Sequence, residues 1–260
     1  MTTNVRARRP RLVAGNWKMH KAPAEGAALA GELRGLIGPA PAAAVTICPP
    51  FPALAAVGQA LAGSPLRLGA QNLHAEPQGA FTGEVSGKML RALGCDWVIV
   101  GHSERRHLMG EDDVAVAAKL RAAQREGLTP IVCVGETLIE REAERTAEVL
   151  VRQVHAAYDG LSAEAALATV IAYEPVWAIG TGKVATPEQA RTAHQMIRAT
   201  LDRVVGPGVG ESLAVLYGGS VNPGNAPSLF AEHDIDGALV GGAALEAASF
   251  YRIVAAAGVG

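Results

Sequence analysis

The segment TVIAYEPVWAIGTGK, residues 169–183, contains the strand end around which the rest of the chain can be organised. Its first five residues, rich in β-branched side chains, are typical of a buried strand. Glu174 stands where that strand ends, and Pro175 then removes a backbone donor and stiffens the chain. Gly180-Thr181-Gly182 permits large backbone rotations before a helix capped by Thr186. The segment therefore places a carboxylate beside a lid-like loop, although taken alone it fits a solvated glutamate before an ordinary loop equally well.

The same strand-then-helix unit is predicted eight times along the chain. Because apolar strands alternate strictly with helices, we expect a parallel sheet covered by helices. Eight units without a domain-sized linker, and without a Gly-x-Gly-x-x-Gly after the first strand, favour a single-domain closed (β/α)8 barrel of the α/β class over an open doubly wound sheet. The strands are expected at 12–18, 44–48, 66–72, 96–101, 130–134, 169–173, 213–217 and 235–240, with a highly charged helix at 138–158.

Composition narrows the classes of protein and partner. The 260 residues are 49% hydrophobic, enough for a sizeable core, and the net charge of −2 gives no electrostatic case for nucleic acid. No apolar run is long enough to span a membrane. Residues 1–11 are basic but lack an apolar signal core, so they are expected to form a disordered leader before a catalytic domain at 12–260. The cysteines are Cys48, Cys95 and Cys133, and their spacing predicts neither a metal site nor a disulfide framework, which favours a cytoplasmic protein.

Polar residues gather at the predicted strand ends. In a closed parallel barrel all of these ends lie on one face, where active sites are found. Each residue alone has a bland explanation, such as a solvated lysine, a histidine satisfied by local backbone, or a glycine turn. Together they are predicted to form a catalytic set, which comprises Asn16, Lys18, Gln71, His102, Glu104, Glu174, Ser220, Gly241 and Gly242.

The residue types at the predicted strand ends indicate a type of reaction. Backbone N–H groups of the Gly-rich turns after strands seven and eight can approach an anion closely, which is typical of a phosphate site. Glu174, desolvated under a closing lid, is expected to have a raised pKa and to abstract a proton from carbon. His102 can donate a hydrogen bond to a developing oxyanion, and Lys18 can balance its charge. The pattern predicts proton abstraction next to a carbonyl in a small phosphorylated sugar, without a metal.

Six motifs between residues 13 and 250 resemble the triosephosphate isomerase family. That resemblance implies a TIM barrel without a cofactor, in which Glu174 is the base, neutral His102 acts on the substrate oxygens, and Asn16 and Lys18 stabilise their charge. It also implies phosphate binding by the backbones of Gly180, Ser220, Gly241 and Gly242, support from Ser103 and Glu104, a lid at 175–182, and a homodimer formed through the loop around Phe81 and Thr82, near Asn16 of the neighbouring subunit. The motifs are GNWKM (15–19), GAFTGE (79–84), GHSERR (101–106), AYEPVWAIGTGK (172–183), YGGSV (217–221) and VGGA (240–243).

Two positions depart from the commoner family pattern, and two rival functions remain open. His20 stands where asparagine is frequent, and Ala244 stands where serine is frequent. A sister isomerase of four-carbon sugar phosphates would use the same base and phosphate loops, but the lid carries no insertion for a larger substrate. A non-catalytic scaffold would be expected to have lost a catalytic residue, and none is lost. We therefore expect interconversion of dihydroxyacetone phosphate and D-glyceraldehyde 3-phosphate, in glycolysis and gluconeogenesis.

Overall fold

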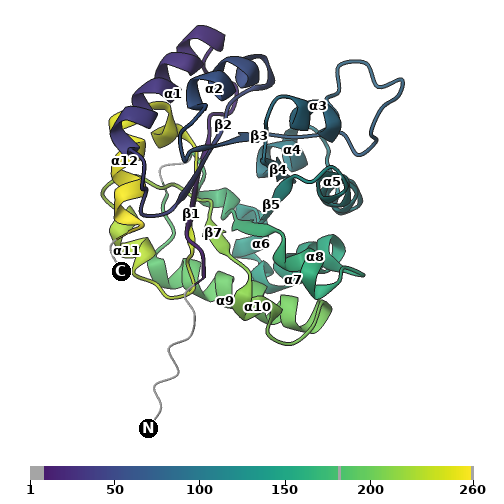
Figure 1. The fold of residues 1–260 in the computed structure, drawn as a ribbon. Coiled ribbons are helices and arrows are strands. Elements are labelled where there is room, and N and C mark those ends of the chain that lie inside the picture. The colour runs from purple at the N-terminus through teal and green to yellow at the C-terminus, as the bar shows by residue number, and fades with distance from the viewer. Residues whose placement is uncertain (1–8, 181–182, 259–260) are drawn as a thin grey trace.

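The computed structural model describes residues 9–180 and 183–258, and its centre is a closed barrel of eight parallel strands (Figure 1). Neighbouring strands pair in sequence order, and β1 closes the barrel against β8. The predicted closed (β/α)8 barrel is therefore confirmed. The strands are β1 (Leu12–Asn16), β2 (Ala44–Cys48), β3 (Arg67–Ala70), β4 (Trp97–Val100), β5 (Thr129–Val134), β6 (Val170–Tyr173), β7 (Val215–Tyr217) and β8 (Gly237–Val240).

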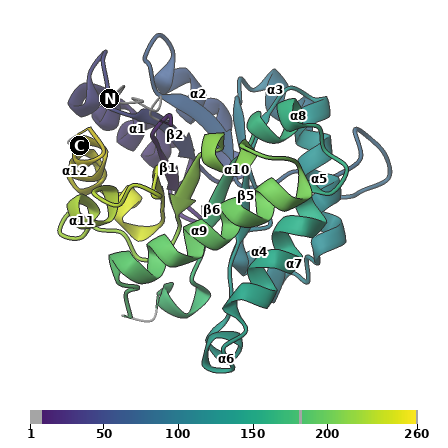
Figure 2. The ribbon, with the colours of Figure 1, turned by 90° about the horizontal axis from the view of Figure 1, so that it is seen from below.

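The helices form a ring outside the strands, as the view along the barrel in Figure 2 shows. Amphipathic spacing explains this arrangement for the longer helices, which bury one face against the sheet, whereas the short helix at Leu138–Glu142 has no buried residue. The α-helices are α1 (Pro23–Ile37), α2 (Leu54–Leu61), α3 (Gly87–Ala92), α4 (Ser103–Leu108), α5 (Asp113–Arg125), α6 (Leu138–Glu142), α7 (Thr146–Tyr158), α8 (Ala163–Leu167), α9 (Pro187–Val204), α10 (Val209–Ser212), α11 (Ala226–Phe230) and α12 (Ala247–Ala256). Within the described residues, the short 3₁₀ helices are η1 (Phe51–Ala53), η2 (Val176–Ala178) and η3 (Gly242–Leu245).

The charged helix expected at 138–158 is two helices, α6 and α7. The chain leaves helical geometry at Glu144, whose φ of 57° lies in the left-handed region. The first piece is closed at its start by a capping box, in which Thr137 and Glu140 satisfy each other's backbone N–H groups. Helical spacing continues across the break, so the spacing alone predicted one helix where the backbone makes two.

Two apolar layers hold the barrel together. Alternate strand residues point inward and form a compact cluster inside the barrel, in which Ile131 and Cys133 of β5 lie near Ala172 of β6. The intervening residues point outward and form a larger cluster with the helices, as Val132 does. This period-2 alternation lets one short strand serve both layers. All three cysteines are buried and free of disulfides.

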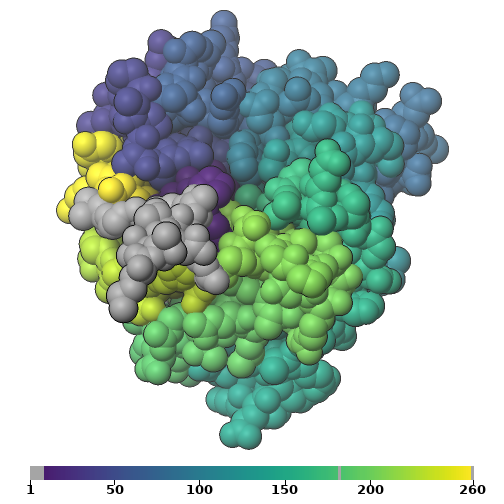
Figure 3. Space-filling view, turned by 60° about the horizontal axis from the view of Figure 1, so that its bottom comes forward, coloured from purple at the N-terminus to yellow at the C-terminus, as the bar shows by residue number. Residues whose placement is uncertain are grey.

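The N-terminal end of the barrel is tied by buried charges. Arg9 donates to Asp236 at 2.7 Å, and Arg198 of α9 donates to the same carboxylate at 2.6 Å. Figure 3 looks onto this face, where the purple start of the described chain lies among green and yellow segments from much later in the sequence. Arg11 bonds to the carbonyls of Phe230 and Ala257. Arg9 and Arg11, at the end of the expected leader, are thus hydrogen-bonded to the barrel, while the disorder expected for residues 1–8 falls outside the described residues.

Barrel closure depends on one close backbone approach. A side chain on Gly237 would place its Cβ 1.8 Å from the carbonyl oxygen of Leu12, and the φ of Gly237 is 140°. Both facts require glycine where β8 meets β1.

Across the described ranges, no helix is both long and apolar enough to cross a bilayer.

Candidate active site

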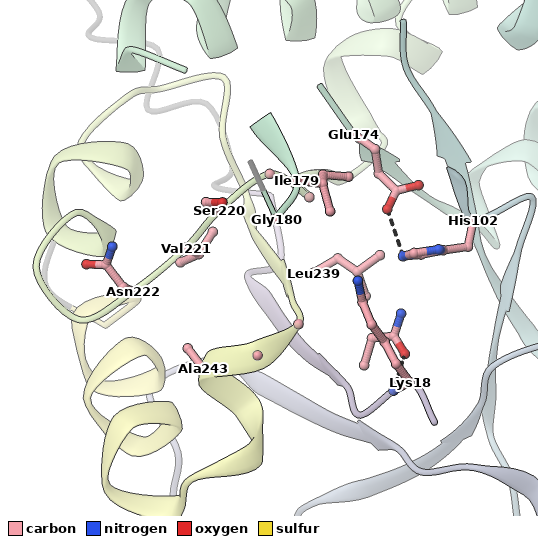
Figure 4. Close-up of a pocket in the computed structure, with 15 residues that line it drawn as sticks. Lys18, His102, Glu174, Ile179, Gly180, Ser220, Val221, Asn222, Leu239 and Ala243 are labelled. Carbon is pink, nitrogen blue, oxygen red and sulfur yellow. Dashed lines mark hydrogen bonds and ion pairs between the residues drawn. The ribbon is translucent and has the colours of Figure 1, made fainter. Parts of the chain in front are cut away.

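A cavity of about 400 Å³ opens at the carboxyl ends of the strands (Figure 4). Its walls come from the ends of β1, β4, β6, β7 and β8, so residues far apart in sequence meet there. In Figure 4, Glu174 and His102 face each other on one side, and Ser220 and Gly180 lie on the other. The lining includes all eight residues predicted to be catalytic or phosphate-binding, which are Asn16, Lys18, His102, Glu174, Gly180, Ser220, Gly241 and Gly242.

Glu174 follows β6 directly and is only 2% exposed. Its backbone N–H donates to Val134 at 2.7 Å, which continues the β5–β6 pairing by one residue. Gly135 makes this approach possible, because a Cβ there would lie 1.7 Å from the Glu174 carbonyl oxygen. The carboxylate accepts hydrogen bonds from the Ser103 N–H at 2.8 Å and from His102 Nε2 at 2.9 Å. Both carboxylate oxygens are therefore engaged in this arrangement.

His102 precedes α4, and its ring is fixed from both sides. The backbone N–H of Glu104 donates to Nδ1 at 3.2 Å, so Nδ1 is an acceptor and the ring proton of the neutral imidazole lies on Nε2. Nε2 then donates to Glu174. The hydrogen-bond network thus selects the tautomer whose N–H faces the cavity.

The pKa of Glu174 is lowered in this structure, whereas the increase was expected for the carboxylate under a closing lid. Burial by itself raises the pKa of this carboxyl, but His102 and the N–H of Ser103 stabilise the carboxylate by more. Burial likewise lowers the pKa of His102, but the neighbouring Glu174 carboxylate raises it overall. The expectation considered desolvation and left out the partner that occupies the carboxylate.

Lys18 is held in an unusual backbone conformation at the edge of the cavity. Its φ is 52°, and its N–H donates to Asn16 Oδ1 at 3.0 Å while its carbonyl accepts from Gln71 Nε2 at 2.9 Å. Its ammonium pairs with the Glu104 carboxylate. Gln71 was expected among the residues at the strand ends. The structure places it as a support for the Lys18 backbone, outside the lining of this cavity.

The predicted lid at 175–182 contains η2 and is joined to the opposite side of the cavity through Ser220. The Ser220 hydroxyl donates to the Ala178 carbonyl at 2.7 Å, which connects the loop after β7 to the lid. Gly180 lines the cavity, and residues 181–182 of the predicted lid lie outside the described residues. η3 begins at Gly242, beside the same cavity.

Sequence reasoning missed Glu136, which holds the start of the lid. This carboxylate is fully buried and accepts hydrogen bonds from the Trp177 indole N–H at 2.9 Å and from the Tyr173 hydroxyl at 3.1 Å. Arg141 donates to it at 3.3 Å and lies 4.2 Å over the Trp177 ring, in cation–π geometry. The signal was available, because Glu136 follows β5 nearly as directly as Glu174 follows β6.

The loop predicted to form a dimer extends from the barrel in Figure 1, between β3 and α3. Phe81 in this loop is 43% exposed, and its ring lies 4.0 Å from that of His74. Thr82 next to it is also exposed. A second cavity lies beside the first. Met19 and Met109 line part of it, and both side chains are exposed. The structure is of one chain, so it leaves the homodimer a prediction.

Comparison with known proteins identifies the family of this chain. The family model described as triosephosphate isomerase matches residues 11–257. Proteins named triosephosphate isomerase from Moorella thermoacetica and Thiobacillus denitrificans are each 54% identical, over 95% and 96% of this chain and 98% and 99% of their own lengths. The protein of the same name from Rhodopirellula baltica is 51% identical over 95% of this chain and 97% of its own length. This chain belongs to the triosephosphate isomerase family.

Proposed function

We propose that this chain interconverts dihydroxyacetone phosphate and D-glyceraldehyde 3-phosphate, the isomerase step shared by glycolysis and gluconeogenesis. The observation that carries the proposal is the buried Glu174 carboxylate, 2.9 Å from an imidazole N–H, in a cavity that also contains glycine-rich backbone. A carboxylate base, a neutral electrophile and an anion site are what proton transfer next to a carbonyl requires. The exchange takes place within one substrate molecule, so the proposal includes no cofactor.

The proton transfers follow from the positions of these groups. Glu174 takes the proton from C1 of the ketose and returns it at C2, with a cis-enediolate between the two steps. His102 presents its Nε2–H to the two substrate oxygens and moves the hydroxyl proton between them. Lys18 and the Asn16 amide stabilise the charge that develops on those oxygens. Ser103 and Glu104 support this arrangement, because their N–H groups hold Glu174 and His102 before substrate arrives.

Substrate binding changes the partners of Glu174, and this prepares both groups for the reaction. To reach a substrate carbon, the carboxylate must leave the Ser103 N–H and the His102 ring. Once these contacts are lost, burial dominates and raises the pKa of Glu174 while it lowers that of His102. The base becomes stronger and the imidazole stays neutral at the step that needs both.

The phosphate lies, in this proposal, against the backbone N–H groups of Gly180, Ser220, Gly241 and Gly242 on the far side of the cavity. Closure of the lid at 175–182 then excludes water and retains the enediolate, whose mobility would otherwise allow loss of phosphate. We also propose a cytoplasmic homodimer in which the loop carrying Phe81 and Thr82 covers Met19 and Met109 of the neighbouring subunit, because those side chains are 92% and 66% exposed in one chain.

The test is a coupled assay with D-glyceraldehyde 3-phosphate beside erythrose and erythrulose phosphates. The proposal predicts a kcat/KM of order 10⁸ M⁻¹s⁻¹ for the triose phosphate. This is the diffusional ceiling, and triosephosphate isomerases are among the enzymes known to reach it. Turnover of the four-carbon sugars is expected to be weak. A preference for the four-carbon substrates would change the assigned substrate but leave Glu174 as the proposed base. Absence of turnover with either, in a protein shown by light scattering to be dimeric, would overturn the proposed function.

A further inference from the structure

The loop between β7 and α11 brings Ser220 into the cavity and is clamped from behind by Asn225. The Asn225 side-chain Nδ2 donates to the Ser220 carbonyl at 2.9 Å, and its Oδ1 accepts from the Asn222 N–H at 2.8 Å. Asn225 is half-buried and does not line the cavity. Its side chain therefore contacts the loop that lines the cavity but does not itself enter the cavity.

The orientation of the Asn225 amide is fixed by its partners. A backbone N–H can only donate and a carbonyl oxygen can only accept, so the opposite amide orientation would place two donors together and two acceptors together. Asn222 completes the clamp, because its own Oδ1 accepts from the N–H groups of Gly224 at 2.8 Å and Asn225 at 3.1 Å. In Figure 4, Ser220, Val221 and Asn222 follow one another along this loop on the side of the cavity opposite His102. The two asparagines thus form a closed set of hydrogen bonds across the turn.

Ser220 is consequently held at two points. Asn225 fixes its carbonyl, and its hydroxyl bonds to Ala178 of the lid at 2.7 Å. The two residues before it, Gly218 and Gly219, have no side chain with which to hold the loop in place. Loss of the Asn225 contact would free the Ser220–Val221 peptide to rotate, and with it the direction of the neighbouring backbone N–H groups.

We propose that Asn225 is a positioning residue for recognition of the substrate phosphate. It holds the Ser220 backbone in the orientation that binds the anion, and it has no part in the proton transfers at Glu174 and His102. The inference rests on the proposed function, since it assigns the phosphate to this end of the cavity. Its consequence is specific: removal of the clamp weakens binding of phosphate-bearing ligands and leaves chemistry on a substrate without phosphate unchanged.

The experiment compares Asn225→Ala with Ser228→Ala in the full-length protein. Ser228 is an exposed residue of α11 whose hydroxyl donates to the Asn225 carbonyl at 2.9 Å, so its loss removes a bond of the same region without touching Ser220. Three quantities are measured: kcat/KM for D-glyceraldehyde 3-phosphate, kcat/KM for D-glyceraldehyde, and the dissociation constant of inorganic phosphate by calorimetry. For Asn225→Ala we expect about a tenfold fall in the first and about a tenfold weaker phosphate affinity, the size of one lost hydrogen bond to a charged group, with glyceraldehyde turnover unchanged. Ser228→Ala stays near wild type in all three.

The outcomes separate the clamp from a general structural role. Equal losses with and without phosphate on the substrate, or no loss in either, would overturn the inference. Should Asn225→Ala fail to fold, Asn225→Leu gives the same test, because it keeps the approximate size of the side chain and removes the donor to the Ser220 carbonyl without adding a charge near the anion. The calorimetric arm needs no turnover. A wild-type protein that binds phosphate but does not isomerise the triose would refute the proposed function and still leave the clamp to be judged by its phosphate affinity.

Discussion

Acidification should destabilise this protein through His194, a histidine of α9 that has no part in the proposed reaction. The ring is fully buried, its Nδ1 lies 2.9 Å from the Asp234 carbonyl, and it forms a T-shaped pair with the ring of Tyr173. The charged groups facing it are Arg198, Arg9 and the Asp234 carboxylate. Burial lowers the pKa of His194 to about 3, from an ordinary value of 6.5. Since the unfolded chain binds a proton at this site between those two pH values, the free energy of unfolding falls as the pH falls through that window.

The magnitude follows from the two pKa values. At pH 5 the unfolded histidine is almost fully protonated and the folded one is neutral, so the loss of stability between pH 7 and pH 5 is about 2 kcal/mol from this residue. The perturbation is His194→Asn, in which the amide N–H replaces the Nδ1–H that faces the Asp234 carbonyl and the titrating group is gone. The assay is urea unfolding of both proteins at pH 7 and pH 5, at one fixed protein concentration because the family is expected to be dimeric.

The variant will be less stable than the wild type at pH 7, since a smaller side chain leaves a cavity. The comparison that matters is the change with pH, in which acid-sensitive carboxylates contribute equally to both proteins. The wild type should lose about 2 kcal/mol more than His194→Asn over these two pH units. Equal losses in the two proteins would refute the assignment of a neutral, titration-resistant histidine to this site.

Two further predictions concern the base and the N-terminal end of the barrel. Glu174→Asp withdraws the carboxylate by about one methylene, so kcat should fall about 100-fold with KM nearly kept, and steady-state kinetics showing near-normal turnover would remove Glu174 from its proposed role. Arg9→Gln leaves the buried Asp236 carboxylate with Arg198 as its remaining cation, and should cost about 1–3 kcal/mol in thermal unfolding. Arg34→Gln, at an exposed arginine of α1, is the matched control and should change the melting temperature little, so equal shifts would argue against a tie at Arg9.

The barrel and the convergence of the site could be predicted because both depend on simple periodic patterns. Parallel strands that alternate with helices end on one face, so Asn16, His102 and Glu174 had to meet once the eight strands were recognised. Their place in one cavity follows from topology and needs no knowledge of side-chain contacts. The local break at Glu144 was not predictable from spacing, because helical periodicity continues across one residue with positive φ.

Contacts that join distant segments were beyond the sequence pattern. Glu136 bonds to a tryptophan 41 positions later, and Arg9 bonds to a carboxylate 227 positions later. Local propensity gives no information on such pairs, since the partner of a buried charge is decided by packing. The charge itself is nevertheless visible in the sequence, because Glu136 and Glu174 both follow strands of the barrel nearly directly. A charged residue directly after an apolar strand can therefore either face the cavity, as Glu174 does, or hold the loop beside it, as Glu136 does.

The lowered pKa of Glu174 bears on how such a base is kept ready. A buried carboxylate without partners would be protonated more easily and would lose its ability to act as a base before substrate arrived. The Ser103 N–H and the His102 ring prevent this by stabilising the charged form in the empty cavity. The same contacts make the resting carboxylate a weaker base, so they have to be broken for the reaction to proceed. In the proposed mechanism, lid closure over the bound phosphate supplies that free energy. The hydrogen bond from Ser220 to Ala178 joins the proposed phosphate side of the cavity to the loop that follows Glu174.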